Sequence, residues 1–96
     1  MTMMKVAVHP GEILRELYLD PLEMSPIALA KRLGVPRTRI ERLCKLDVSM
    51  SVDTALRLAK FFSTTPDYWL NMQKNFDLIS NRDQVDVSGI RPLQAA

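Results

Sequence analysis

The sequence has a single cysteine, Cys44, and a single histidine, His9, among its 96 residues. One cysteine cannot form a disulfide within the chain, and this pair is too small for the Cys/His sets that hold zinc. No apolar run approaches the ~20 residues that a helix needs to cross a bilayer, and no signal segment opens the chain. We therefore expect a cytoplasmic protein without a metal, a cofactor or a membrane contact.

Aromatic residues are also scarce, at 6% of the chain, whereas apolar residues make up 47% and charged residues 25%. This composition is typical of a compact chain that folds in water. A chain of this length forms one domain, which buries roughly two thirds of the surface that the unfolded chain exposes. A two-domain enzyme is excluded.

The charges are unevenly placed, although the net charge is only +2. Residues 31–45 carry six basic side chains against Glu41 alone, while the rest of the chain has seven basic and ten acidic residues. A polarised molecule with one basic face favours a polyanionic partner.

Prolines and capping residues predict an all-α fold. Ser25-Pro26 and Thr65-Pro66 are typical helix starts, because a first-turn proline loses no hydrogen bond and the hydroxyl can cap the helix. Gly34 is expected to end a helix in a tight turn, and Asp20-Pro21 to end another. The expected helices span 10–19, 26–33, 36–45, 52–62 and 66–76.

Apolar residues at helical spacing predict the inner faces of these helices. The expected inward residues, helix by helix, are Ile13, Leu14 and Leu17; Leu29, Ala30 and Leu33; Ile40 and Leu43; Leu56, Ala59 and Phe62 or Phe61; and Trp69, Met72 and Phe76. Residues 84–88 instead alternate polar and apolar side chains, and Gly89 and Pro92 exclude a long helix there. We expect a domain over 1–80 and an arm over 81–96, either a short strand or mobile.

The segment 26–45 has the spacing of a helix-turn-helix, with small Ala30 at the helix crossing and Gly34 in the turn. If Ile40 and Leu43 face inward, the helical period turns a row of basic residues outward. Arginine can bind guanine and threonine can meet a thymine methyl, so Arg37, Thr38 and Arg42 are the expected base contacts. The side chains better placed for phosphates are Lys31, Arg32, Arg39 and Lys45.

Four motifs resemble the HigA antitoxins of the lambda-repressor-like, or XRE, group of helix-turn-helix proteins. They are His9-Pro10-Gly11-Glu12-Ile13-Leu14, Leu29-Ala30 with Leu33-Gly34-Val35, Asp53-Thr54-Ala55-Leu56-Arg57-Leu58-Ala59, and Pro66 with Trp69-Leu70-Asn71 and Gln73. The resemblance covers about residues 8–80. It implies a five-helix lambda-repressor-like domain that forms a homodimer, binds a palindromic operator in its own promoter, and neutralises a HigB-type ribonuclease toxin.

Two residues depart from the family pattern. Pro26 stands where members usually have a glutamine, and Lys45-Leu46-Asp47 replaces their Asn-Gly-Lys/Arg turn. Both changes remove phosphate contacts, so DNA affinity is expected to be weaker than the family norm or shifted onto the arginines of the third helix.

The same residues bear on other possible functions of the chain. No convergent set of acid, base and nucleophile is present, so no catalytic residue is expected, and His9 is better explained as a helix cap or a surface residue. Packing explains Cys44 better than a reactive thiol does. An orphan regulator without a toxin and an adaptor that binds only protein remain alternatives. The expected dimer contacts are Phe76, Leu78 and Ile79.

Overall fold

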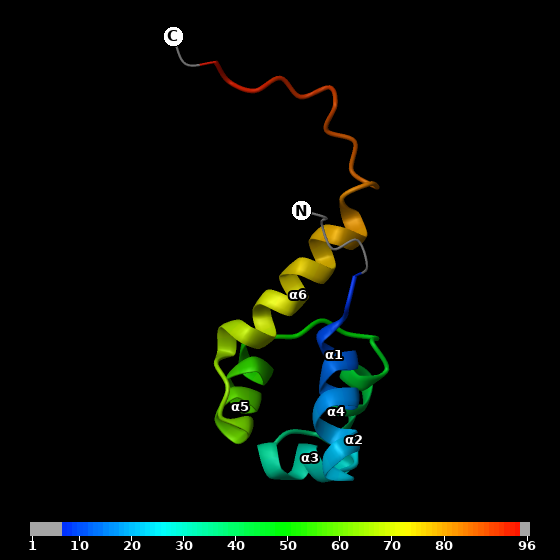
Figure 1. The fold of residues 1–96 in the computed structure, drawn as a ribbon, viewed down its shortest axis with the longest axis vertical. Coiled ribbons are helices and arrows are strands. Elements are labelled where there is room, and N and C mark those ends of the chain that lie inside the picture. Colours follow the sequence, from blue (N-terminus) through cyan, green and yellow to red (C-terminus); the bar gives the residue numbers. More distant parts are fainter. Residues whose placement is uncertain (1–6, 95–96) are drawn as a thin grey trace.

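A computed structural model describes residues 7–94 and is all-helical over that range (Figure 1). Three adjoining stretches, α1, the π-helix η1 and α2, run without a break and form the first of five continuous helices. The elements are α1 (Pro10–Ile13), η1 (Leu14–Leu19), α2 (Asp20–Leu22), α3 (Pro26–Leu33), α4 (Arg37–Cys44), α5 (Val52–Phe62) and α6 (Pro66–Asn81). The five-helix lambda-repressor-like fold is confirmed.

The first helix does not end at Asp20-Pro21, which corrects the expectation from the sequence. The backbone N–H of Asp20 donates to the carbonyl of Arg15, five residues earlier, and Pro21 continues the helix into α2. The wider π turn moves the carbonyl that the ring of Pro21 would meet in an ordinary helix. The chain leaves the helix only at Glu23, whose φ of 52° is left-handed.

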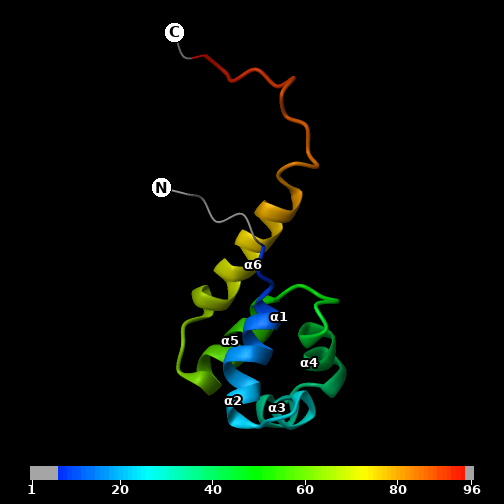
Figure 2. The same cartoon turned by 45° about the vertical axis from the view of Figure 1, so that its right-hand side comes forward.

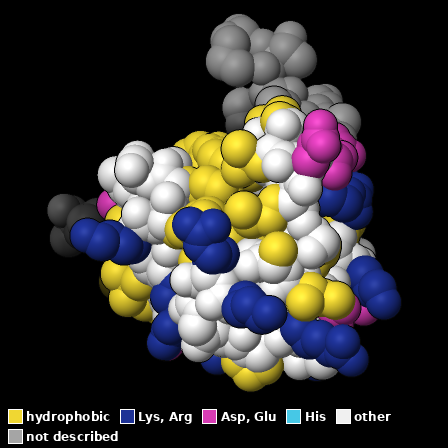
Figure 3. Space-filling model, turned by 90° about the horizontal axis from the view of Figure 1, so that it is seen from below, with side chains coloured by type: hydrophobic (Ala, Val, Ile, Leu, Met, Phe, Trp, Pro, Cys, Tyr) yellow, Lys and Arg dark blue, Asp and Glu magenta, His cyan; other side chains and the backbone are white. Residues whose placement is uncertain are grey.

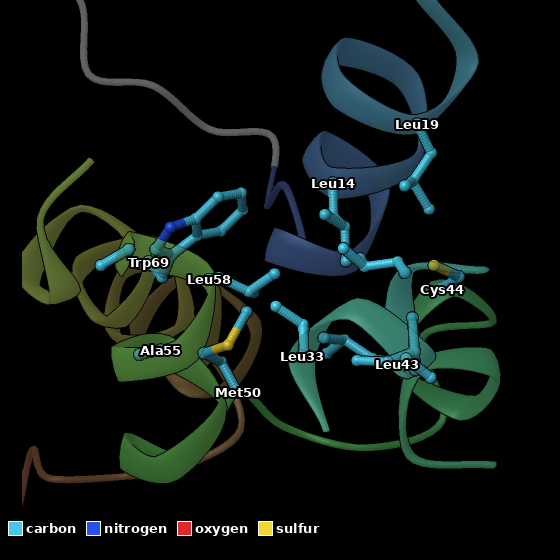
Figure 4. Packing of buried hydrophobic residues seen from close by; sticks show 13 residues of the cluster. Leu14, Leu19, Leu33, Leu43, Cys44, Met50, Ala55, Leu58 and Trp69 are labelled. Atoms are coloured by element: carbon cyan, nitrogen blue, oxygen red, sulfur yellow. The ribbon is translucent and has the colours of Figure 1, made fainter. Parts of the chain in front are cut away.

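The core lies where all five helices meet (Figure 4). Leu14, Leu29, Ile40, Leu58 and Trp69 are fully buried there. Two of the expected inward residues were assigned wrongly, since Leu17 on the first helix and Leu56 on α5 are exposed. The buried face of α5 is formed instead by Thr54, Ala55, Leu58 and Ala59.

Helix α6 runs to Asn81, five residues beyond the expected end. The side-chain amide of Asn81 donates to the carbonyl of Asp77 at 2.7 Å and so closes the last turn. Residues 82–94 then lead away from the helical body and contain neither helix nor strand (Figure 1). Residues 84–88 form no strand within the single chain, and the arm over 81–96, as a short strand or a mobile segment, stays a prediction. The domain boundary at residue 80 stays a prediction.

His9 caps α1, which is one of the two roles that the sequence indicated, but it is buried and not a surface residue. Its Nδ1 accepts the backbone N–H of Gly11 at 2.9 Å, and its ring meets the edge of Phe76 with 4.9 Å between centroids. Burial lowers the pKa of His9, and this outweighs a backbone hydrogen bond at Val48 and the charges of Asp77 and Glu12. The cap thus requires a neutral imidazole.

We expect the free energy of unfolding to fall as the pH drops from 7.5 through 6.5. The unfolded chain binds a proton at the ordinary histidine pKa, whereas the folded chain binds it only at lower pH, so protons favour unfolding in this window. His9→Asn retains an oxygen cap without a titratable ring and should remove most of this slope. Urea denaturation at several pH values measures it. Equal slopes in both proteins would show that other groups cause the loss.

Candidate nucleic-acid interface

Helices α3 and α4 are joined by a tight turn at Gly34. The Oγ atom of Ser25 accepts the N–H of Ala28 at 3.0 Å and starts α3. Gly34 has φ of 74°, a conformation that a side chain would strain. The N–H of Val35 returns to the carbonyl of Ala30 at 3.1 Å. This is the geometry of a helix-turn-helix, with α4 in the place of the recognition helix.

The two sides of α4 have opposite character. Ile40, Leu43 and Cys44 are buried against the rest of the domain. The expected base-contacting residues all lie on the exposed side: Arg37, Thr38 and Arg42. All three side chains are therefore exposed on the same helix, and none of them is buried against the domain.

The expected phosphate contacts are placed less uniformly. Lys31 and Lys45 are exposed, at the last turn of α3 and just after α4. The guanidinium of Arg32 lies over the ring of Phe61, 5.0 Å from its centroid. Arg39 is half-buried, and its Nη1 lies 2.7 Å from Oδ1 of Asp53. Two of the four side chains thus have partners within the protein.

Asp53 connects α4 to α5 and, through Arg57, to α3. Its Oδ1 atom accepts hydrogen bonds from both Arg39 Nη1 and Arg57 Nε, each at 2.7 Å. Arg57 Nη1 also donates to the carbonyl of Leu33 at 2.8 Å. The two guanidinium groups lower the pKa of Asp53, Arg57 contributing most. No role was predicted for Asp53 or Arg57, although their spacing of four residues on a helix is a signal for an ion pair.

A hollow of about 500 Å³ lies between α4 and the start of α5. Thr38, Arg39 and Arg42 line its α4 side, and Ser51 and Asp53 its α5 side.

Seen from the end of the molecule where α3 lies, Lys and Arg side chains spread over the visible face with apolar groups between them (Figure 3). The acidic side chains in this view lie toward its edges. Figure 2 shows α3 and α4 together on one side of the first helix.

The opposite end of α4 is fastened by the first helix. Nη1 of Arg15 donates to the carbonyl of Cys44 at 2.9 Å, where α4 ends. Gly11 passes so close to α4 that a Cβ atom at that position would overlap the carbonyl oxygen of Leu43. Neither contact was predicted, because the sequence does not show which backbone atoms two helices bring together.

The turn after α4 keeps a glycine-like shape without glycine. Leu46 stands where the HigA pattern has glycine, and its φ is 64°. Asp47, which follows, is exposed. Leu46 thus adopts a conformation that favours glycine, and Asp47 is an acid where the resemblance to HigA places a cation.

Cys44 belongs to the core. Its side chain is buried, and burial raises the pKa of the thiol despite the nearby charge of Arg15. A raised pKa keeps the sulfur protonated and unreactive at neutral pH. Packing, the interpretation favoured from the sequence, is consistent with this position.

The fold and the exposed side of α4 define a protein of the helix-turn-helix class. Within residues 7–94, no cluster of three or more His, Cys, Asp or Glu side chains could hold a metal ion. Over the same part of the chain, every helix is too short or too polar to span a bilayer.

The chain belongs to the family described as Helix-turn-helix, whose model matches residues 14–69. Virulence-associated protein I of Dichelobacter nodosus is 44% identical over 88 residues, which cover 91% of this chain and 82% of that protein. The Pseudomonas aeruginosa antitoxin HigA, solved with the higBA promoter, has a TM-score of 0.83 and 32% identity, covering 93% of this chain and 100% of that one. Antitoxin GraA in complex with its operator has a TM-score of 0.86 and 34% identity, covering 99% of both chains. The resemblance to HigA antitoxins is confirmed.

Proposed function

We propose that the protein is a dimeric transcriptional repressor that acts as the antitoxin of a HigB–HigA type toxin–antitoxin system. The observation that carries this proposal is the exposed row of Arg37, Thr38 and Arg42 on a helix held in recognition geometry. The similarity to HigA and GraA, each solved with its own promoter or operator DNA, supports it.

In the proposed complex, α4 enters the major groove with Arg37, Thr38 and Arg42 toward the base edges. Two copies related by a twofold axis would reach successive grooves about 34 Å apart, so the operator should be an inverted repeat. The proposed phosphate contacts are Lys31, Arg32, Arg39 and Lys45. These contacts fix the position on the duplex, while the α4 side chains read the sequence.

The proposed dimer contact lies near the end of α6. Leu78 is 62% exposed, a large apolar side chain with little packing in the single chain, and Ile79 is half-buried beside it. Phe76 is half-buried against His9, so only part of its ring can contribute to a partner. Burying these side chains against a second copy would remove apolar surface from water.

The proposed antitoxin activity is binding to a HigB-type ribonuclease that the adjoining gene would encode. The acidic residues outside α4, with the segment after Asn81, are the surface we propose for a basic toxin. Deleting residues 81–96 and measuring dimer mass and toxin binding tests this assignment, and retention of both would reject it.

The function itself is tested with the upstream promoter and the neighbouring gene product. A gel shift on the promoter, together with rescue of growth when the two genes are co-expressed, would support the proposal. Promoter binding without rescue would identify an orphan regulator. Rescue without promoter binding would identify an adaptor that binds only protein.

Lys31→Ala should weaken binding to every duplex alike and lower the logarithmic salt slope by about 0.9, because one phosphate contact releases about that much counterion. Lys74→Ala on α6 removes the same charge from a helix outside the proposed interface and serves as the control. Fluorescence anisotropy between 50 and 200 mM salt measures both slopes. The same slope for Lys31→Ala and the wild type would contradict the phosphate assignment.

A further inference from the structure

Asp53 is an acidic side chain on a face that we assign to a polyanion. Its carboxylate is 56% exposed and lines the hollow that also contains Thr38 and Arg42. A negative charge near DNA phosphates opposes binding, by roughly fivefold for two unit charges about 4 Å apart in water. An acidic residue at this position is therefore expected to favour DNA binding in another way that offsets this repulsion.

The contacts of Asp53 show what that role is. Arg39 is bound through Nη1 alone, which leaves the Nε and Nη2 hydrogens of the same guanidinium directed elsewhere. Arg57 is fixed at both ends, by Asp53 and by the carbonyl of Leu33 at the end of α3. Asp53 is thus anchored to the corner of the helix-turn-helix and holds Arg39 at the first turn of α4.

We propose that Asp53 is a positioning residue for DNA binding: it holds the Arg39 guanidinium by one nitrogen so that the remaining donors meet a backbone phosphate at the hollow between α4 and α5. The inference rests on the proposed DNA-binding function and deepens it. A guanidinium fixed before binding loses less conformational entropy per contact than a mobile one. A single arginine can bridge a carboxylate and a phosphate because its donors point in several fixed directions.

Two substitutions separate positioning from simple charge. Asp53→Asn and Asp53→Ala remove the same negative charge, but only asparagine retains an oxygen that can accept from Arg39. We expect Asp53→Ala to bind a random duplex about eightfold more weakly than Asp53→Asn at 0.1 M salt, with a salt slope lower by about 0.9, the effect of one lost phosphate contact. Equal affinities and slopes for the two variants would overturn the proposal.

The Arg39→Ala background identifies the residue through which Asp53 acts. There, Asp53→Asn and Asp53→Ala should bind equally, because no guanidinium remains to be positioned. A persistent difference would show that Asp53 acts through Arg57 and the fold, and would also overturn the proposal. Asp67→Asn, at the second residue of α6, is the charge control for a helix start outside the hollow.

A random duplex is used because a phosphate contact does not depend on sequence, so the test does not require the operator. Binding is compared at a temperature where circular dichroism shows every variant folded. If the wild type binds no duplex at low salt, the proposed function fails and this inference with it. If the wild type binds and the two Asp53 variants are indistinguishable, only this inference fails.

Discussion

Arg37→Ala and Arg42→Ala are each expected to weaken binding to the operator by about 1–3 kcal/mol, roughly 5- to 150-fold, and to relax the base preference at the contacted position. Both side chains are exposed on α4, and neither belongs to the ion-pair network around Asp53. Their donors are therefore available to base edges without breaking a contact within the protein. Anisotropy titrations with the operator and with single-base variants measure the effect.

A random duplex separates base reading from phosphate binding for the same two variants. Loss of a base contact should lower affinity for the operator far more than affinity for random DNA. Lys31→Ala, whose proposed contact is a phosphate, should instead weaken both duplexes by the same factor. Equal losses on both duplexes for Arg37→Ala or Arg42→Ala would reassign that arginine to the backbone.

Local signals in the sequence predicted most of the helices. Ser25, Ser51 and Thr65 each accept a backbone N–H at the start of a helix, as their residue types indicated. Gly34 takes the left-handed conformation that its position in the turn requires. These features were predictable because each depends on a few neighbouring residues.

The errors arose where an irregular helical turn or packing between distant segments decides the outcome. Pro21 was expected to break the first helix, but a π turn accommodates it. Leu56 fits a helical stripe as well as Leu58 does, and only the packing of α5 against α6 and α3 shows which is buried. The contact of Arg57 with the carbonyl of Leu33 joins residues 24 positions apart, and no local pattern encodes it.

In the candidate site, too, local features could be predicted from the sequence, whereas contacts between helices could not. The placement of Arg37, Thr38 and Arg42 on the exposed side of α4 follows from the helical period once Ile40 and Leu43 face inward. The partners of Arg32 and Arg39 lie on α5 and are set by how that helix crosses the other two. Sequence periodicity therefore predicted which α4 side chains are exposed, while the contacts of Arg32 and Arg39 became visible only in the structure.

Gly11→Ala should lower the free energy of unfolding by about 3 kcal/mol, at the upper end of the cost of overpacking a core. The new Cβ would overlap the carbonyl oxygen of Leu43, a backbone atom of α4 that cannot rotate away as a side chain can. Leu43 is itself buried, so relief requires the first helix and α4 to separate. For a domain with about 5–15 kcal/mol of stability, this is a large share.

The sign of this effect distinguishes close packing from helix propensity. Alanine is favoured over glycine within a helix by about 1 kcal/mol, so without the contact the substitution would stabilise the protein. Gly89→Ala adds the same methyl group in a turn outside the helices, where a Cβ meets no atom within 4 Å, and it controls for the substitution without the contact. Urea denaturation of the three proteins decides between the two effects, and a Gly11→Ala protein as stable as the wild type would contradict the close approach. Because α4 carries Arg37 and Arg42, a shift of this helix should also weaken operator binding in the fraction that stays folded.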